Sequence, residues 1–310
     1  PYTTLFRSNR AIQLAKQLSV EHVVVDASEE FRVQVEQYFV DEYLAGRTPN
    51  PCVKCNQTIK WPYLFDQAQK LGCDFVSTGH YASISDYHGK KAISGSLDTN
   101  KDQSFFLWGL TPELLNKVIF PLATKTKSEI LKIAHEHGFS FMENQKSSLG
   151  ACFIDAPNYR QYLQKYCLLK GYNIQSGIFT DISGNWLGRH QGYPYFTIGQ
   201  RHGLDLNLKR PMFVQSIDVQ TGIIVLSEFK DLFLSSFALN PYILHFDKIN
   251  NNQLVEIKVR YRGQSVMGTI RTTNKNLEIA LSEPEWGIAP GQSVALYDNN
   301  ILIGGGYISD

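Results

Sequence analysis

The chain has 310 residues, with 30 Lys and Arg against 29 Asp and Glu, and its formal net charge is +1. This balance excludes binding to a polyanion through overall charge, so a nucleic acid could bind only through a local basic patch. Five cysteines without a secretory signal favour a reducing compartment, either the cytoplasm or an organelle matrix, over a disulfide-linked scaffold, and we expect a cytoplasmic protein. No run of about 18 apolar residues occurs, so no membrane-spanning helix is predicted. The length predicts two or three domains.

The first part of the sequence alternates helical patterns with short apolar runs. After an amphipathic pattern at 11–18, the segment HVVVD at 22–26 has the pattern of a buried parallel strand. A second helix is expected over 28–44 and a second strand, DFVST, over 74–78. This order indicates an open α/β sheet, in which ligands bind beyond the carboxyl ends of the strands.

The segment GRTPNPCVKCNQTIKW at 46–61 carries a Cys-x-x-Cys pair, Cys52 and Cys55. Pro49 and Pro51 predict a stiff, non-helical loop that lasts until after the cysteines, followed by a helix. A nearby helix N-terminus would lower the pKa of a thiol and make it reactive. A zinc half-site and two merely small, apolar cysteines are equally open interpretations at this point.

In the rest of the chain, a mixture of helix and strand patterns gives way to strand patterns alone. Alternation over 82–96 predicts a β-hairpin, and helices are expected over 128–137 and 159–169. From about Gly171, short runs of Val, Ile, Phe and Tyr alternate with turn residues. The last third is therefore predicted to be all-β.

Three polar segments are candidate ligand contacts with ordinary structural alternatives. Gly79-His80 follows a predicted strand, although His80 alone is more often a hydrogen-bonded loop histidine. Lys101-Asp102-Gln103 precedes an apolar run, where capping of a helix is the commoner role than phosphate binding. Arg260-Tyr261-Arg262 forms a basic and aromatic cluster, whose alternative is an exposed strand face.

Seven segments in one order relate the chain to a known family: GRTPNPCVKCNQTIKW, STGHYA, NKDQSFFLWGL, GACFI, HQGYPYFTIGQRHGL, RYRGQ and APGQSVALYDNNILIGGG. The set resembles the tRNA-specific 2-thiouridylases, the MnmA/TrmU family, from about Asn9 to the C-terminus. The resemblance implies an α/β, parallel-sheet adenine-nucleotide-binding domain of the PP-loop (HUP-like) type over 1–165. It further implies a small β-rich tRNA-binding module over 166–229 and a C-terminal β-barrel over 230–310.

The resemblance implies ATP-dependent 2-thiolation of the wobble uridine of tRNA. ATP, with Mg²⁺, would adenylate the C2 oxygen, and a cysteine persulfide would then supply sulfur. By position, Cys55 matches the nucleophile and Cys152, in GACFI, the persulfide carrier, and the two would form an alternating disulfide. Besides tRNA, the expected partner is a sulfur donor, either a cysteine desulfurase or a sulfur-relay protein. The chain is expected to be a monomer.

Binding residues follow from the same resemblance, position by position. Gly79 matches an ATP contact, and a larger set matches contacts to tRNA. That set comprises Asn50, Pro51 and Cys52, at the target base, and His80, Lys101, Asp102, Gln103, Arg260, Tyr261 and Gln292. A flipped uridine needs polar groups to read its edge and basic groups to hold the flanking phosphates.

The sequence departs from the family at Cys52, where many members carry Asp. Cys52, Cys55 and Cys152 together could hold a [4Fe–4S] cluster with one open iron, which would bind hydrosulfide in place of a persulfide mechanism. Structural zinc is a further alternative. Two other classes also remain: a non-catalytic tRNA-binding protein, and another adenylating enzyme such as a relative of argininosuccinate synthase.

A second departure is the absence of an SGGxDS-type loop, which in this family cradles the ATP phosphates through backbone N–H groups. We therefore expect an N-terminally truncated member, in which residues 1–8 stand in place of the first strand-loop-helix units.

The expected consequence is that this chain alone does not turn over ATP. An ATP/pyrophosphate exchange assay with tRNA should give no signal above a protein-free control. Robust formation of pyrophosphate would contradict the prediction.

Overall fold

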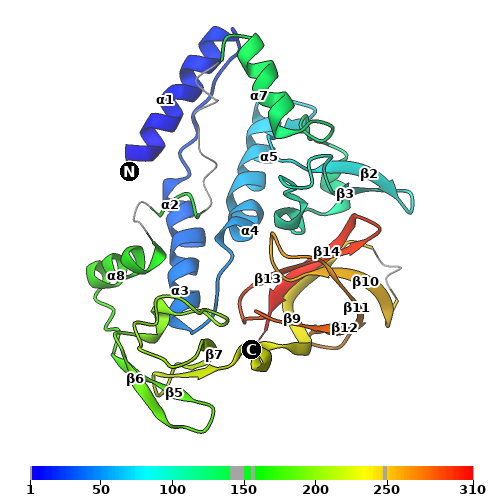
Figure 1. Cartoon of the computed structure of the whole chain (residues 1–310). Helices are drawn as coiled ribbons and strands as arrows, with labels where there is room; N and C mark the ends of the chain where they lie inside the picture. Colours follow the sequence, from blue (N-terminus) through cyan, green and yellow to red (C-terminus); the bar gives the residue numbers. More distant parts are fainter. Residues whose placement is uncertain (1, 140–149, 155–157, 247–249, 310) are drawn as a thin grey trace.

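The computed structural model describes residues 2–139, 150–154, 158–246 and 250–309. Figure 1 shows a helical α/β part, a small β-sheet beside its helices, and a C-terminal barrel. This arrangement confirms the predicted fold class. In the described residues, no helix has both the length and the apolar character needed to cross a membrane.

Two π-helical segments join shorter helices into longer stretches. Residues 32–37 connect α2 to α3, and residues 56–60 connect α4 to α5. The helices are α1 (Tyr2–Gln17), α2 (Ser28–Phe31), α3 (Tyr38–Leu44), α4 (Pro51–Cys55), α5 (Trp61–Lys70), α6 (Pro112–Leu115), α7 (Lys127–Glu136) and α8 (Tyr159–Lys170).

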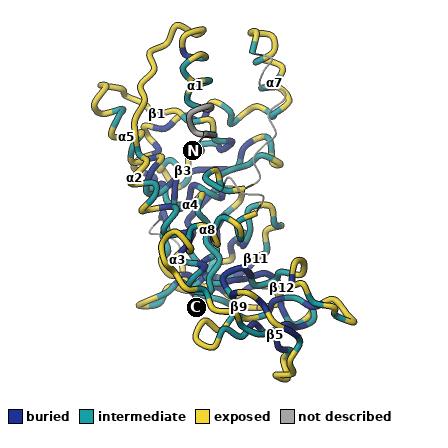
Figure 2. Tube along the Cα trace, turned by 90° about the vertical axis from the view of Figure 1, so that its left-hand side faces the viewer, coloured by how far each residue is buried: buried dark blue, intermediate teal, exposed yellow. Residues whose placement is uncertain are grey.

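The parallel sheet of the α/β part is short. Strand β1 (Val76–Ser77) pairs in parallel with β4 (Val118–Ile119). The strand predicted over 22–26 is wrong: these residues are irregular and exposed (Figure 2), and Val24 is 66 % exposed. A run of valines forms a strand only where a neighbouring strand accepts its hydrogen bonds, and no described strand pairs with it.

The central sheet packs against the helices of the α/β part. Its order is β6-β5-β8-β7, with β5 and β8 parallel and the other pairs antiparallel. Phe39 of α3 and Leu163 of α8 share one buried core with Phe179 of the sheet. The strands are β5 (Gly177–Asp181), β6 (Trp186–His190), β7 (Phe213–Asp218) and β8 (Ile223–Ser227).

The C-terminal strands close into a barrel of order β13-β10-β11-β12-β9-β14, which β13 completes by pairing with β14. Closure leaves its strands without free edges. The predicted hairpin, β2 (Ser83–Tyr87) and β3 (Lys90–Ser94), is confirmed and joins the barrel through β14. The barrel strands are β9 (Leu234–Leu244), β10 (Gln253–Lys258), β11 (Val266–Thr272), β12 (Leu277–Glu285), β13 (Ser293–Asp298) and β14 (Ile301–Ile308).

Trp108 of the α/β part docks on the barrel. Its ring lies 5.3 Å from that of Tyr307, and its Nε1–H donates to Ser293 Oγ at 2.7 Å. The Trp108 carbonyl oxygen lies 2.7 Å from Nε2 of the buried His245. A Cβ at Gly305 would come within 2.5 Å of the Trp108 ring, so glycine permits this close approach. The α/β part and the barrel therefore share one core, which fixes their relative position.

We expect Ser293→Ala to destabilise the protein, because the buried indole N–H of Trp108 would lose the hydroxyl that accepts its hydrogen bond. The expected loss in free energy of unfolding is about 1–3 kcal/mol. Urea unfolding followed by tryptophan fluorescence measures it. Ser235→Ala, at an exposed barrel position, is the control and should behave as wild type; an equally stable Ser293→Ala variant would contradict the docking role.

Candidate active site

Both cysteines of the Cys-x-x-Cys pair lie inside helix α4. Asn50 is the N-cap residue, and its Oδ1 accepts the Val53 N–H at 3.2 Å, while Pro51 occupies the first helical position. The prediction of a non-helical loop around Cys52 and Cys55 is therefore wrong. Proline is favoured at that position, because its missing N–H would have no partner in the helix anyway. The Asn-Pro pair was the overlooked signal for a helix start.

The segment that carries Cys152 is anchored beside Cys55 by its neighbour Phe153. The Phe153 ring packs edge-on against Phe31 at 5.8 Å and Phe39 at 5.3 Å, between ring centroids. It also contacts the apolar cluster that contains the buried Cys55. Cys152 itself is exposed to solvent, and all described cysteines are free thiols. A buried and an exposed thiol thus lie on two segments that share one cluster.

Burial dominates the electrostatics of the thiols. It raises the pKa of the Cys55 thiol to about 11; the charge of Lys60 opposes this shift, and Cys152 and Cys52 add to it. Desolvation also raises the pKa of the Cys52 thiol, again with Cys152 nearby, although this side chain reaches solvent. The prediction that the helix N-terminus lowers the thiol pKa is therefore wrong. Cys152 affects the pKa of both Cys52 and Cys55, and Cys52 affects that of Cys55, so the three thiols lie in one region.

The three thiols do not form a metal site. Among residues 2–139, 150–154, 158–246 and 250–309, no group of three His, Cys, Asp or Glu side chains is arranged to hold a metal ion. The [4Fe–4S] and zinc alternatives accordingly have no geometric support in the described chain, and we derive no chemical step through either.

His80 lies next to the cysteine-bearing helix through its contact with Trp61. The two rings stack at 5.9 Å with an interplanar angle of 20°. Thr78 Oγ1 lies 2.9 Å from His80 Nδ1. Burial, helped by the positive charge of Lys60, lowers the pKa of His80 to about 4, so the ring is neutral at physiological pH. Gly79 before it is exposed, with open space where a Cβ would stand.

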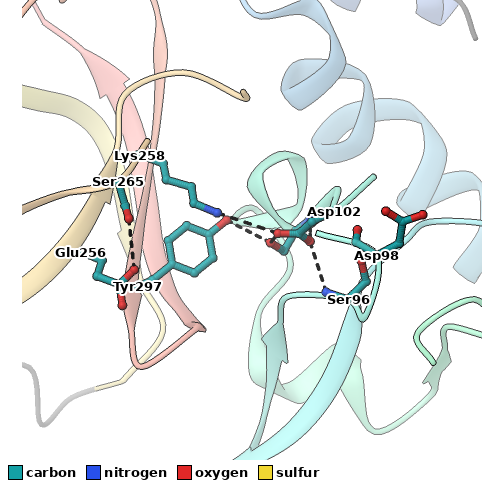
Figure 3. A network of polar contacts seen from close by, with 8 residues as sticks. Ser96, Asp98, Asp102, Glu256, Lys258, Ser265 and Tyr297 are labelled. Atoms are coloured by element: carbon teal, nitrogen blue, oxygen red, sulfur yellow. Dashed lines mark hydrogen bonds and ion pairs between the residues drawn. The ribbon is translucent and has the colours of Figure 1, made fainter. Parts of the chain in front are cut away.

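The carboxylate of Asp102 forms hydrogen bonds and an ion pair within the protein (Figure 3). It accepts hydrogen bonds from the Ser104 N–H at 3.1 Å and Oγ at 3.0 Å, and from the Ser96 N–H at 3.4 Å. From the barrel side, Lys258 Nζ lies 3.9 Å from its carboxylate, and Tyr297 contacts Ser104 at 3.0 Å. This network joins the loop to the barrel, and the N-cap residue of the following short helix, Gln103, makes no side-chain cap hydrogen bond.

The two residues that flank Asp102 differ in how far their side chains interact with the rest of the protein. Gln103 Oε1 accepts the Tyr81 N–H at 3.1 Å, and the Gln103 N–H donates to the Tyr81 carbonyl at 2.7 Å. Lys101 is half-buried, and no carboxylate in the described chain lies within ion-pair distance of it. Of the tripeptide, Lys101 is thus the residue left available to a ligand.

Arg260 is held within the barrel. Its guanidinium pairs with Glu285 at 2.5 Å, donates to the Trp286 carbonyl oxygen at 2.5 Å and stacks over the Trp286 ring at 4.4 Å. Its charge is therefore largely matched. Arg262 is exposed and lies over the Tyr261 ring at 5.7 Å, so it is the more available cation of the cluster.

Tyr261 brings the barrel to the cysteine region. Its ring packs on Phe106 at 4.4 Å, and desolvation raises the pKa of its phenol, with a smaller effect from Cys52. Gln292 lies at a second contact between the parts, where its Oε1 is buried without a hydrogen-bond partner. The carbonyl of Pro290, two residues earlier, accepts the Thr48 N–H at 2.8 Å. The barrel thus meets the α/β part both near Cys52 and at Thr48.

Sequence reasoning missed two contributors to this site. Lys60 lies within the segment that carries the cysteines, but it was given no role; its charge acts on both Cys52 and Cys55. Phe153 lies directly after Cys152, and only its contacts reveal that it anchors this segment. The apolar residue beside a candidate cysteine was the available signal for such an anchor.

Comparisons with known proteins agree with the architecture. Three family models match the chain: a "tRNA methyl transferase HUP domain" over residues 6–156, a "tRNA methyl transferase PRC-barrel domain" over 162–228, and an "Aminomethyltransferase beta-barrel domain" over 236–308. The "tRNA-specific 2-thiouridylase MnmA 1" of Bacteroides fragilis is 39% identical over 307 residues, covering 96% of this chain and 84% of that protein.

Two further relatives are similar over nearly the whole chain. The tRNA-specific 2-thiouridylase MnmA of Cytophaga hutchinsonii is 37% identical, over 97% of this chain and 82% of that protein. That of Carboxydothermus hydrogenoformans is 35% identical, over 98% of this chain and 84% of that protein.

The two thiols should differ in reactivity. Near neutral pH we expect iodoacetamide to modify the exposed Cys152 at least about tenfold faster than the buried Cys55, because the thiolate is the nucleophile. The Cys55 rate should then rise about tenfold per pH unit toward its pKa of about 11. Peptide mass spectrometry measures both rates, with Cys55→Ser as control. Equal rates near neutral pH would contradict the burial argument.

Proposed function

Because the chain belongs to the tRNA-specific 2-thiouridylase family, we propose that it replaces the C2 oxygen of the wobble uridine of tRNA with sulfur. The observation that carries this proposal is the grouping of Cys52, Cys55 and Cys152 in one region, although Cys152 lies on a distant segment. Sulfur transfer needs a polarizable carrier thiol and a second thiol that resolves the resulting S–S bond.

The proposed reaction begins on the uridine. Its C2 oxygen attacks the α-phosphorus of ATP, held with Mg²⁺, and pyrophosphate leaves. The terminal sulfur of a Cys152 persulfide then adds to C2, and AMP departs with the original oxygen. The Cys55 thiol then loses its proton to solvent and attacks Sγ of Cys152, and the electron pair of the broken S–S bond passes to the sulfur on C2. This step yields 2-thiouridine and a Cys55–Cys152 disulfide, which an external dithiol reduces.

The exposure of the two thiols supports these separate roles. Cys152 reaches solvent, where a cysteine desulfurase or sulfur-relay protein can load it. Cys55 is 8 % exposed, and its raised pKa keeps it protonated near neutral pH. A protonated, buried thiol does not attack the persulfide prematurely, because the thiolate is the reactive form.

The tRNA contacts we propose separate into two groups. Asn50, Pro51 and Cys52 border the thiols and would meet the uridine, with Gly79 toward the ATP. His80, Lys101, Tyr261 and Gln292 would contact the tRNA around it. Asp102, Gln103 and Arg260 use their polar groups inside the protein, so we propose that they shape the surface that binds tRNA.

The test is nucleoside analysis of tRNA from thiolase-deficient cells that express this chain joined to a family-type N-terminus. We expect 2-thiouridine to return, and Cys55→Ser or Cys152→Ser to lower it at least about 100-fold, because each removes a sulfur needed for transfer. Cys73→Ser, at an exposed cysteine outside the site, is the matched control and should retain it. A non-catalytic tRNA-binding protein would instead bind tRNA without restoring any 2-thiouridine.

A further inference from the structure

Lys60 is placed at the centre of the thiol region by a π-helical turn. It ends the π-helical segment Asn56–Lys60, in which each N–H pairs with the carbonyl five residues earlier. This pattern sets Lys60 above Cys55, and the Lys60 N–H also hydrogen-bonds the Cys55 thiol. The following residue, Trp61, stacks on His80. Lys60 therefore stands between the cysteines and His80.

The charge of Lys60 reaches three site groups and meets no opposite charge there. It affects Cys52, Cys55 and His80, and no carboxylate affects any of these three. The Lys60 side chain is exposed, and no carboxylate of the described chain pairs with it. By contrast Lys70, further along the same helical stretch, pairs with Asp66 at 2.6 Å.

The neighbouring groups cannot serve as counter-ions near neutral pH. Burial keeps the Cys55 thiol protonated, since its pKa is about 11. His80 is neutral, since its pKa is about 4. Lys60 therefore has no negative partner among these groups, and a cation whose neighbours are neutral attracts an anion. The chemistry of the site thus favours a bound anion.

We propose that Lys60 binds a phosphate of the nucleotide that reacts at the thiols. This inference rests on the proposed function, which brings a uridine to Cys55. Two phosphates can lie there: a backbone phosphate beside the flipped uridine, and the AMP phosphate that leaves C2 when sulfur adds. In the second case Lys60 would stabilise the negative charge of the leaving group as the C2–O bond breaks. A lysine ammonium is a compact phosphate-binding charge.

The first arm of the test uses an anticodon stem-loop RNA with uridine at the wobble position. Its affinity is measured against salt concentration for the wild-type chain and for Lys60→Met, Lys60→Arg and Lys70→Met. If Lys60 holds a backbone phosphate, Lys60→Met should weaken binding several-fold and lower the slope of log affinity against log salt by about 0.7–1. Lys60→Arg keeps the charge and Lys70→Met lies outside the site, so both should match wild type.

The second arm titrates AMP into the protein–RNA complex. If Lys60 holds the leaving phosphate, Lys60→Met should weaken AMP binding at least about fivefold, the loss of one charge-assisted contact, and leave the salt slope unchanged. Unchanged RNA affinity, salt slope and AMP affinity in Lys60→Met would overturn the inference. A wild-type chain that does not bind the stem-loop would instead count against the proposed function, so the two failures are distinguishable.

Discussion

The buried contact between the α/β part and the C-terminal barrel is the constraint on which the site depends. Trp108 and Tyr297 belong to one core that is built from both parts, and Trp108 is tied by hydrogen bonds to barrel residues. Because this core fixes the barrel, Tyr261 reaches the cysteine region at a defined place. A barrel joined to the α/β part only by a linker would not hold Tyr261 at a defined place beside the cysteines.

The two candidate thiols have opposite environments. Cys152 is exposed to solvent, whereas Cys55 is buried. The aromatic contacts of Phe153 account for this difference, since they fasten the exposed segment to the cluster that buries Cys55. The π-helical turn after Cys55 then adds the cation of Lys60, and no carboxylate in the described part of the chain pairs with it.

Predictions from local patterns succeeded where the responsible residues are neighbours in sequence. The hairpin over 82–96 follows from alternation and a tight turn, at which His88 and Gly89 both have positive φ. Helix α8 follows from its periodicity, with Asn158 as N-cap and Gly171 as left-handed C-cap. The prediction of a strand over 22–26 failed, because a strand also requires a neighbouring strand that its own residues do not specify.

The sequence by itself determined the family, the fold class and the identity of the candidate thiols, because ordered motifs and periodic patterns are properties of residues close together in the chain. Only the tertiary structure decided their chemical state. Whether Cys55 is ionised, whether Cys152 faces solvent and whether Asp102 is free to bind tRNA depend on distant segments. Burial and charge act through space, so the pKa of a thiol cannot be read from its neighbours in sequence.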